Sequence, residues 1–124
     1  AGIIDFGDMV KSPLIIDLAV AAAYQLGDGE DPLGCVLPMV AGYHAVRPLQ
    51  APETEILIDL IRTRVITSLL IASYRVMLFP ENREYLLRSY DSARNFLVNL
   101  DQQEADEALQ RIRAACASGC VRPA

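Results

Sequence analysis

The 124-residue sequence predicts an all-α fold of about five helices in a single domain, 1–124, with at most one short strand near its start. Three observations lead to this prediction. Apolar residues make up 52% of the chain, which is enough to form a core. They recur at three- and four-residue spacing over several stretches. Proline and glycine separate these stretches at positions where helices usually begin and end.

The first two helices follow proline-containing start signals. A Ser-Pro pair at 12–13 precedes the apolar run 14–26, and a glycine ends that run. An Asp-Pro pair at 31–32 begins the second helix, which carries apolar residues at helical spacing. Pro38 lies inside this second pattern, so the sequence predicts a kink or a break there.

The longest helix is predicted to open at Pro52-Glu53 and to run to Leu78, before a proline. Its segment 65–72 is apolar on every side, which predicts a central, buried position. A further helix follows and is predicted to break near 89–91. The last helix is expected to end near Ala117, shortly before a glycine.

Charge and composition argue against several classes of partner. The formal net charge is −5, whereas nucleic-acid binding requires a basic face, so nucleic acid is not an expected partner. No apolar run approaches the roughly 18 uncharged residues of a membrane span, so no membrane partner is expected. The three cysteines (35, 116 and 120) are few and odd in number, which indicates reduced thiols and a cytoplasmic location.

The stretch G-I-I-D-F-G-D, residues 2–8, contains the first candidate site. A short apolar strand would deliver Asp5 to a fixed point, and the glycine after it would let the chain turn sharply. This arrangement suits one carboxylate that holds Mg²⁺ against nucleotide phosphates, because Mg²⁺ takes one or two carboxylates and keeps phosphate oxygens. By itself, D-F-G is equally typical of an ordinary turn. Asp8 is either a second metal contact or, more commonly, a turn acid.

The longer segment I-I-D-F-G-D-M-V-K-S-P-L-I-I-D-L-A, residues 3–19, resembles the metal-binding segment of the aminoglycoside phosphotransferase and choline kinase-like family. The segment G-Y-H-A-V-R-P-L, residues 42–49, resembles the hydroxylysine kinase-like branch of that family. The resemblance implies the helical part of a kinase C-terminal lobe, with Asp5 as the catalytic Mg²⁺ ligand. It further implies ATP or GTP as phosphoryl donor, and the hydroxyl of a small amino alcohol or an aminoglycoside-like substrate as acceptor.

The resemblance also implies a supporting role for two other acids. Asp17, in D-L-A, corresponds to an acid that holds the backbone of the catalytic loop, and Asp8 is a weaker candidate for the same support. The alternative for Asp17 is an ordinary exposed helix acid. Its apolar neighbours favour the supporting role, because a buried carboxylate is costly without hydrogen bonds.

Two parts of such a kinase have no counterpart in these residues. The family's catalytic loop, H-G-D-x-x-x-x-N, does not occur, and the N-terminal lobe that grips the nucleotide is missing. The chain is therefore predicted to be a fragment that is inactive alone and binds no cofactor by itself. Apolar surface that the absent lobe would cover is expected to favour a homodimer.

Candidate substrate-binding residues lie on two predicted helices. Arg64 and Arg75 fall near one polar stripe of the longest helix, where they would line a substrate pocket or simply pair with acids and reach water. Tyr43 is a further candidate, although packing is the more common role for it and for its neighbour His44. The acids at 28, 30 and 31 would attract a cationic amine or form a solvated turn.

Two other functions compete with the kinase. One is a non-catalytic helical module that associates through an apolar face. The other is a kinase-like module fused ahead of a pyridoxal-phosphate aminotransferase, because I-R-A-A-C-A-S-G-C, residues 112–120, resembles the close of such a domain. No lysine follows Lys11, so these residues contain no plausible Schiff-base lysine for that chemistry.

Overall fold

The computed structural model describes residues 10–25 and 31–118. Within these ranges every regular element is a helix. The all-α prediction is confirmed. The helix that was predicted to break near 89–91 is indeed divided, into Arg83–Leu86 and Tyr90–Asp101. The strand expected near the start of the chain falls on residues outside these ranges. The elements are α1 (Ile15–Ala23), α2 (Val36–Val46), α3 (Ala51–Leu78), the 3₁₀ turn η2 (Pro80–Asn82), α4 (Arg83–Leu86), α5 (Tyr90–Asp101) and α6 (Ala105–Ser118).

Helix α3 begins and ends where local chemistry requires it. The backbone N–H of Gln50 donates to the Glu53 carboxylate at 2.9 Å, which satisfies a donor at the helix entrance. At the other end, the N–H of Phe79 donates to the carbonyl of Arg75 at 2.8 Å, and Pro80 cannot continue the helix. The predicted boundaries agree with the observed ones to within about one residue.

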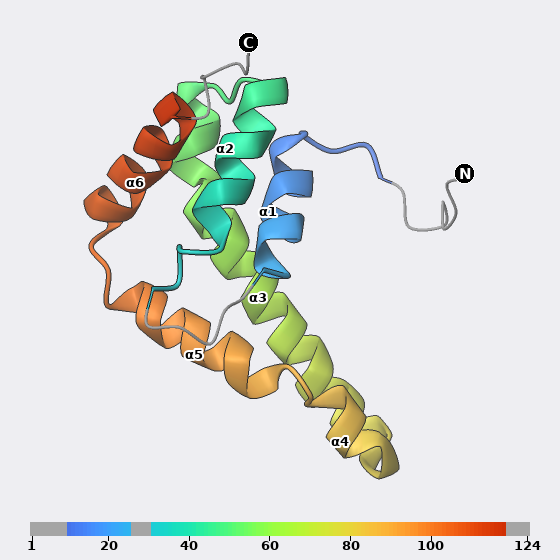
Figure 1. Cartoon of the computed structure of the whole chain (residues 1–124). Coiled ribbons are helices and arrows are strands. Elements are labelled where there is room, and N and C mark those ends of the chain that lie inside the picture. Colours follow the sequence, from blue (N-terminus) through green and yellow to red (C-terminus); the bar gives the residue numbers. More distant parts are fainter. Residues whose placement is uncertain (1–9, 26–30, 119–124) are drawn as a thin grey trace.

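The core surrounds the first half of α3. Helices α1 and α6 pack against that half, α2 packs against α6 and α1, and α5 crosses below them (Figure 1). Burying one large aliphatic or aromatic side chain contributes roughly 1.5–3 kcal/mol, so these contacts dominate the stability of the fold. The largest fully buried side chains are Leu18, Leu33, Val36, Val40, Leu57, Ile61, Val65, Phe96, Leu100 and Ile112.

The sequence predicted a central, buried position for residues 65–72 in the second half of α3, and this prediction was wrong. Val65 is buried, but Ile66, Leu70 and Ile71 are 41%, 66% and 46% exposed. Figure 1 shows the reason, because α3 continues with α4 beyond the part of the bundle that α1, α2 and α6 cover. An all-round apolar helix is buried only where neighbours exist on every side.

The structure also differs from the predictions for the start of the first helix and for Pro38. Helix α1 begins at Ile15 without a side-chain cap, and the carbonyls of Pro13 and Leu14 accept its first N–H groups at 3.1 Å. Pro38 causes no break, because it lies in the first turn of α2, where the N–H that proline lacks would have no helical partner.

Candidate functional site

The acids implied by the kinase motif are only partly within the described ranges. Asp5 and Asp8 lie outside them, so their metal and support roles stay predictions. Asp17 lies in the first turn of α1 and is exposed, whereas the next two residues, Leu18 and Ala19, are buried. Its carboxylate therefore faces away from the core formed by α1 and α3, and its role in supporting a catalytic loop stays a prediction.

Tyr43 lies at the end of α2, next to a polar network that joins α2 to α3. Its ring is half-buried against the core, and the Arg47 guanidinium carbon lies 5.9 Å from the ring centroid. This distance is typical of a cation–π contact. The structure therefore packs Tyr43 against the core, and its substrate-binding role stays a prediction.

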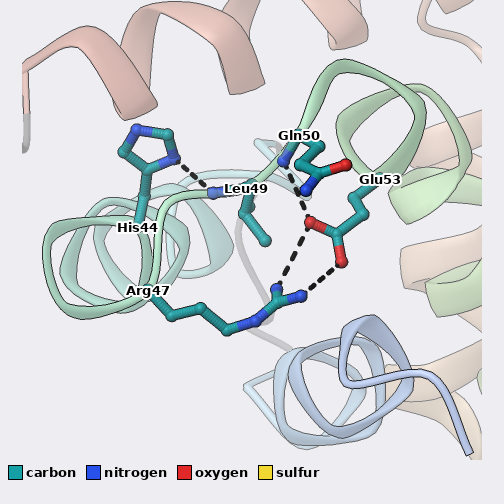
Figure 2. A network of polar contacts seen from close by, with 5 residues as sticks. All are labelled: His44, Arg47, Leu49, Gln50 and Glu53. Carbon is teal, nitrogen blue, oxygen red and sulfur yellow. Dashed lines mark hydrogen bonds and ion pairs between the residues drawn. The ribbon is translucent and has the colours of Figure 1, made fainter.

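Figure 2 shows the rest of this network at the corner between the two helices. Arg47 binds Glu53 with both terminal nitrogens, at 2.7 and 3.3 Å. The hydrogen bond from Arg47, with a second one from the Gln50 N–H, lowers the pKa of Glu53 below its usual range. The N–H of Leu49 donates to Nδ1 of His44 at 3.0 Å. These contacts fix the connection between the two helices.

Arg64 reaches across from α3 to the end of α1. Its Nη2 donates to the Tyr24 hydroxyl at 2.8 Å, and its guanidinium carbon lies 5.6 Å from the Tyr24 ring centroid. Arg75 lies more than two turns further along α3 and is exposed. The two arginines of the predicted stripe therefore have different environments, and only Arg64 lies beside a cavity.

That cavity opens between the end of α1, the middle of α3 and the start of α5. Its volume is about 430 Å³. Apolar walls come from α3. The guanidinium of Arg88 and the hydroxyl of Ser89 come from the segment that joins α4 to α5, and further hydroxyls come from the helices. The lining residues are Ala23, Tyr24, Val65, Ser68, Leu69, Ala72, Tyr85, Leu86, Arg88, Ser89, Tyr90, Ser92 and Ala93. No local sequence pattern marked this cavity.

Asp31 belongs to the acidic segment that was weighed as an amine-binding or solvated turn. It is exposed and directly precedes a turn, as the solvated-turn alternative expects, and Arg111 of α6 donates hydrogen bonds to both of its carboxylate oxygens, at 2.9 and 2.6 Å. The N–H of Leu33 donates to the same carboxylate at 3.1 Å. The other two acids of that segment lie outside the described residues.

Within 10–25 and 31–118, no three histidine, cysteine, aspartate or glutamate side chains lie together as metal ligands would. In the same ranges, no helix combines the length and the apolar character that crossing a bilayer requires.

Known proteins resemble this chain over most of its length. Hydroxylysine kinase of Danio rerio is 35% identical over 111 residues, which are 90% of this chain and 31% of the fish protein. The hydroxylysine kinase of Xenopus laevis is 35% identical over 112 residues, 90% of this chain and 30% of that protein. The protein of the same name from Mus musculus is 36% identical over 87 residues, 70% of this chain and 23% of its own length.

The motif at 3–19 resembles that of the aminoglycoside phosphotransferase and choline kinase-like family, which is a class of small-molecule kinases. The matches point to one branch of this class, because they show that the chain is a relative of the hydroxylysine kinases. The predicted resemblance to that branch is confirmed. This chain spans between 23% and 31% of the length of the relatives named here. No model of a known protein family matches the sequence, and no solved structure matches it.

Proposed function

We propose that these residues form the helical lobe of a phosphotransferase that moves the γ-phosphate of ATP or GTP to a hydroxyl of a small amino alcohol. The observation that carries this proposal is the 35% identity to two hydroxylysine kinases over nine-tenths of the chain. The name of those relatives makes hydroxylysine the first acceptor to test, with other amino alcohols and aminoglycosides after it.

The proposal assigns chemistry to the acids of the motif. Asp5 would hold Mg²⁺, which would supply positive charge against the negative charge of the transferred phosphoryl group. Asp17, exposed at the start of α1, would accept hydrogen bonds from the catalytic-loop backbone, and Asp8 would assist it. The relatives carry some two-thirds or more of their length outside the matched region, so the 124 residues alone are expected to transfer no phosphate.

The test is a phosphoryl-transfer assay with the full gene product, Mg²⁺, ATP or GTP, and hydroxylysine. Asp5→Asn is expected to lower kcat at least about a hundred-fold, the size of effect typical when one electrostatic contact to the reacting group is removed. Glu84→Gln is the matched control, because Glu84 is an exposed acid of α4. Full activity of Asp5→Asn, or turnover of none of the amino alcohols, would contradict the proposal.

A second candidate function is association through the second half of α3. The observation that favours it is a group of exposed apolar side chains on one part of the molecule, called here the α3 surface. We propose that in the isolated chain a second copy covers it. Its members are Ile66, Leu70, Ile71, Tyr74, Met77, Leu78, Phe79 and, from α4, Tyr85.

Sedimentation of the 124-residue chain tests the association. The chain is expected to form a dimer at micromolar concentration, and the double variant Leu70→Glu/Met77→Glu is expected to be a monomer. Val46→Glu is the control, because Val46 is 89% exposed but lies on α2, outside the α3 surface. A monomeric wild type, or a double variant that stays dimeric, would rule this candidate out.

A further inference from the structure

The cavity beside Tyr24 has no part in the phosphoryl-transfer proposal, and its properties are those of a ligand site. Its volume of about 430 Å³ lies within the range of roughly 300–1,000 Å³ that small-molecule sites occupy. Val65, Leu69 and Ala72 of α3 give it an apolar wall. Such sites combine an apolar wall with a few polar groups that fix the orientation of the ligand.

The charges around the cavity are positive. Arg88 is the only charged side chain among the lining residues, all of which lie in the described ranges, and no carboxylate lines the cavity. The acids nearest in sequence, Glu84 and Asp91, are exposed and lie outside the lining. Arg64 adds a second guanidinium beside the cavity, where it donates to the Tyr24 hydroxyl at 2.8 Å.

The tyrosine rings of the cavity already interact with these arginines. The Arg64 guanidinium carbon lies 5.6 Å from the Tyr24 ring centroid, and that of Arg88 lies 5.7 Å from the Tyr85 ring centroid. Both distances are within the range of cation–π contacts. A ligand amine would have to displace a guanidinium from a ring face and would meet like charge, so the cavity disfavours cations.

We propose that this cavity binds a small organic anion, a carboxylate or a phosphate ester with an apolar or aromatic body. Arg88 would donate to the anionic group, because a guanidinium matches the two oxygens of a carboxylate or phosphate. The α3 wall would contact the body of the ligand. The Ser89 hydroxyl, which makes no capping hydrogen bond at the start of α5, is a further donor. This binding goes beyond phosphoryl transfer and does not depend on it.

The experiment compares two probes of nearly equal size and opposite charge, benzoate and benzylamine, by NMR titration of the ¹⁵N-labelled 124-residue chain. Saturable shifts with benzoate are expected at residues 88–93 and around Tyr24. Arg88→Gln is expected to weaken benzoate binding about ten-fold or more, which is the loss typical for a hydrogen bond to a charged group. Arg83→Gln is the matched control, because Arg83 is an exposed arginine five residues earlier, outside the lining.

Phenyl phosphate in place of benzoate distinguishes a phosphate-ester site from a carboxylate site, and saturable binding of either supports the proposal. The proposal is wrong if benzylamine binds as tightly as benzoate, if Arg88→Gln binds like the wild type, or if neither anion shifts these resonances at millimolar concentration. Arg88 is exposed, so its variant is expected to fold, and circular dichroism verifies this.

Discussion

Arg111 of α6 donates two hydrogen bonds to Asp31, which lies 80 residues earlier in the chain, just before α2. The two contacts are 2.9 and 2.6 Å long, and they use both oxygens of the carboxylate. The same carboxylate accepts the N–H of Leu33 at 3.1 Å. The hydrogen bond from Arg111 holds the pKa of Asp31 below its usual value of 3.8, although partial burial opposes the shift. The pair therefore fastens the segment before α2 to the last helix.

Replacing this arginine is expected to destabilise the fold modestly. In Arg111→Gln the free energy of unfolding at pH 7 should fall by about 0.5–1 kcal/mol, because the Asp31 side chain is 49% exposed and water screens the interaction. Urea denaturation followed by circular dichroism measures the change. Arg83→Gln, in which an exposed arginine of α4 is changed, should leave the midpoint unaltered.

The effect of Arg111→Gln should depend on pH in one direction. A carboxyl group whose pKa is lower in the folded state contributes stability above its unfolded pKa, and this contribution is lost as the pH falls through the folded pKa. The difference between wild type and Arg111→Gln should thus be full at pH 6–7 and shrink below about pH 4, where the carboxyl group begins to be protonated. An unchanged difference at pH 2.5 would show that the carboxylate is not responsible.

Two leucines of α3 are expected to differ sharply although they share a helix. Leu57→Ala should lower the free energy of unfolding by about 2–5 kcal/mol, because Leu57 is fully buried and the change leaves a cavity. Leu70→Ala should change it by less than about 0.5 kcal/mol, because Leu70 is 66% exposed. Denaturant titration of both variants, at a concentration where the chain is monomeric, gives the comparison. Equal losses would mean that the second half of α3 is covered in solution.

The helices were predictable because their signals are local. Proline and glycine punctuation placed α3 correctly, since a capping carboxylate and a following proline act within a few residues of the helix end. Whether an apolar face is covered depends on distant elements, so residues 66–72 looked central and are largely exposed. Apolar periodicity reports what a helix is able to bury and not what lies next to it.

The candidate sites also differ in whether their signals are local in the sequence. The motif at 3–19 carries its order and spacing in the sequence itself, so Asp5 and Asp17 could be named without a structure. The cavity beside Tyr24 is assembled from α1, α3 and α5, and neither Tyr24 nor Arg88 has a local pattern that marks it. The contact between Asp31 and Arg111 was equally invisible, because nothing local pairs residues 80 positions apart.

The two described cysteines should react with alkylating reagents at very different rates. Cys35 is exposed, whereas Cys116 is buried in α6, and burial raises the pKa of its thiol. The thiolate is the reactive form, so iodoacetamide at pH 8 should modify Cys35 at least about ten-fold faster than Cys116. Peptide mass spectrometry over a time course resolves the two sites. Denaturant should abolish the difference, and equal rates in the native chain would contradict the burial of Cys116.

The corner between α2 and α3 should be sensitive to loss of Arg47. In Arg47→Gln the Glu53 carboxylate loses contacts at 2.7 and 3.3 Å and keeps only the N–H of Gln50. The melting temperature at pH 7 should therefore fall, and more than in Arg83→Gln. Arg47 holds the pKa of Glu53 below its usual value of 4.5, so its stabilising effect should be complete near neutral pH and disappear as the pH falls well below 4.5. Melting curves at pH 7 and pH 3 test both statements. A melting temperature at pH 7 equal to that of the wild type would show that the corner is held by His44 and by apolar packing alone.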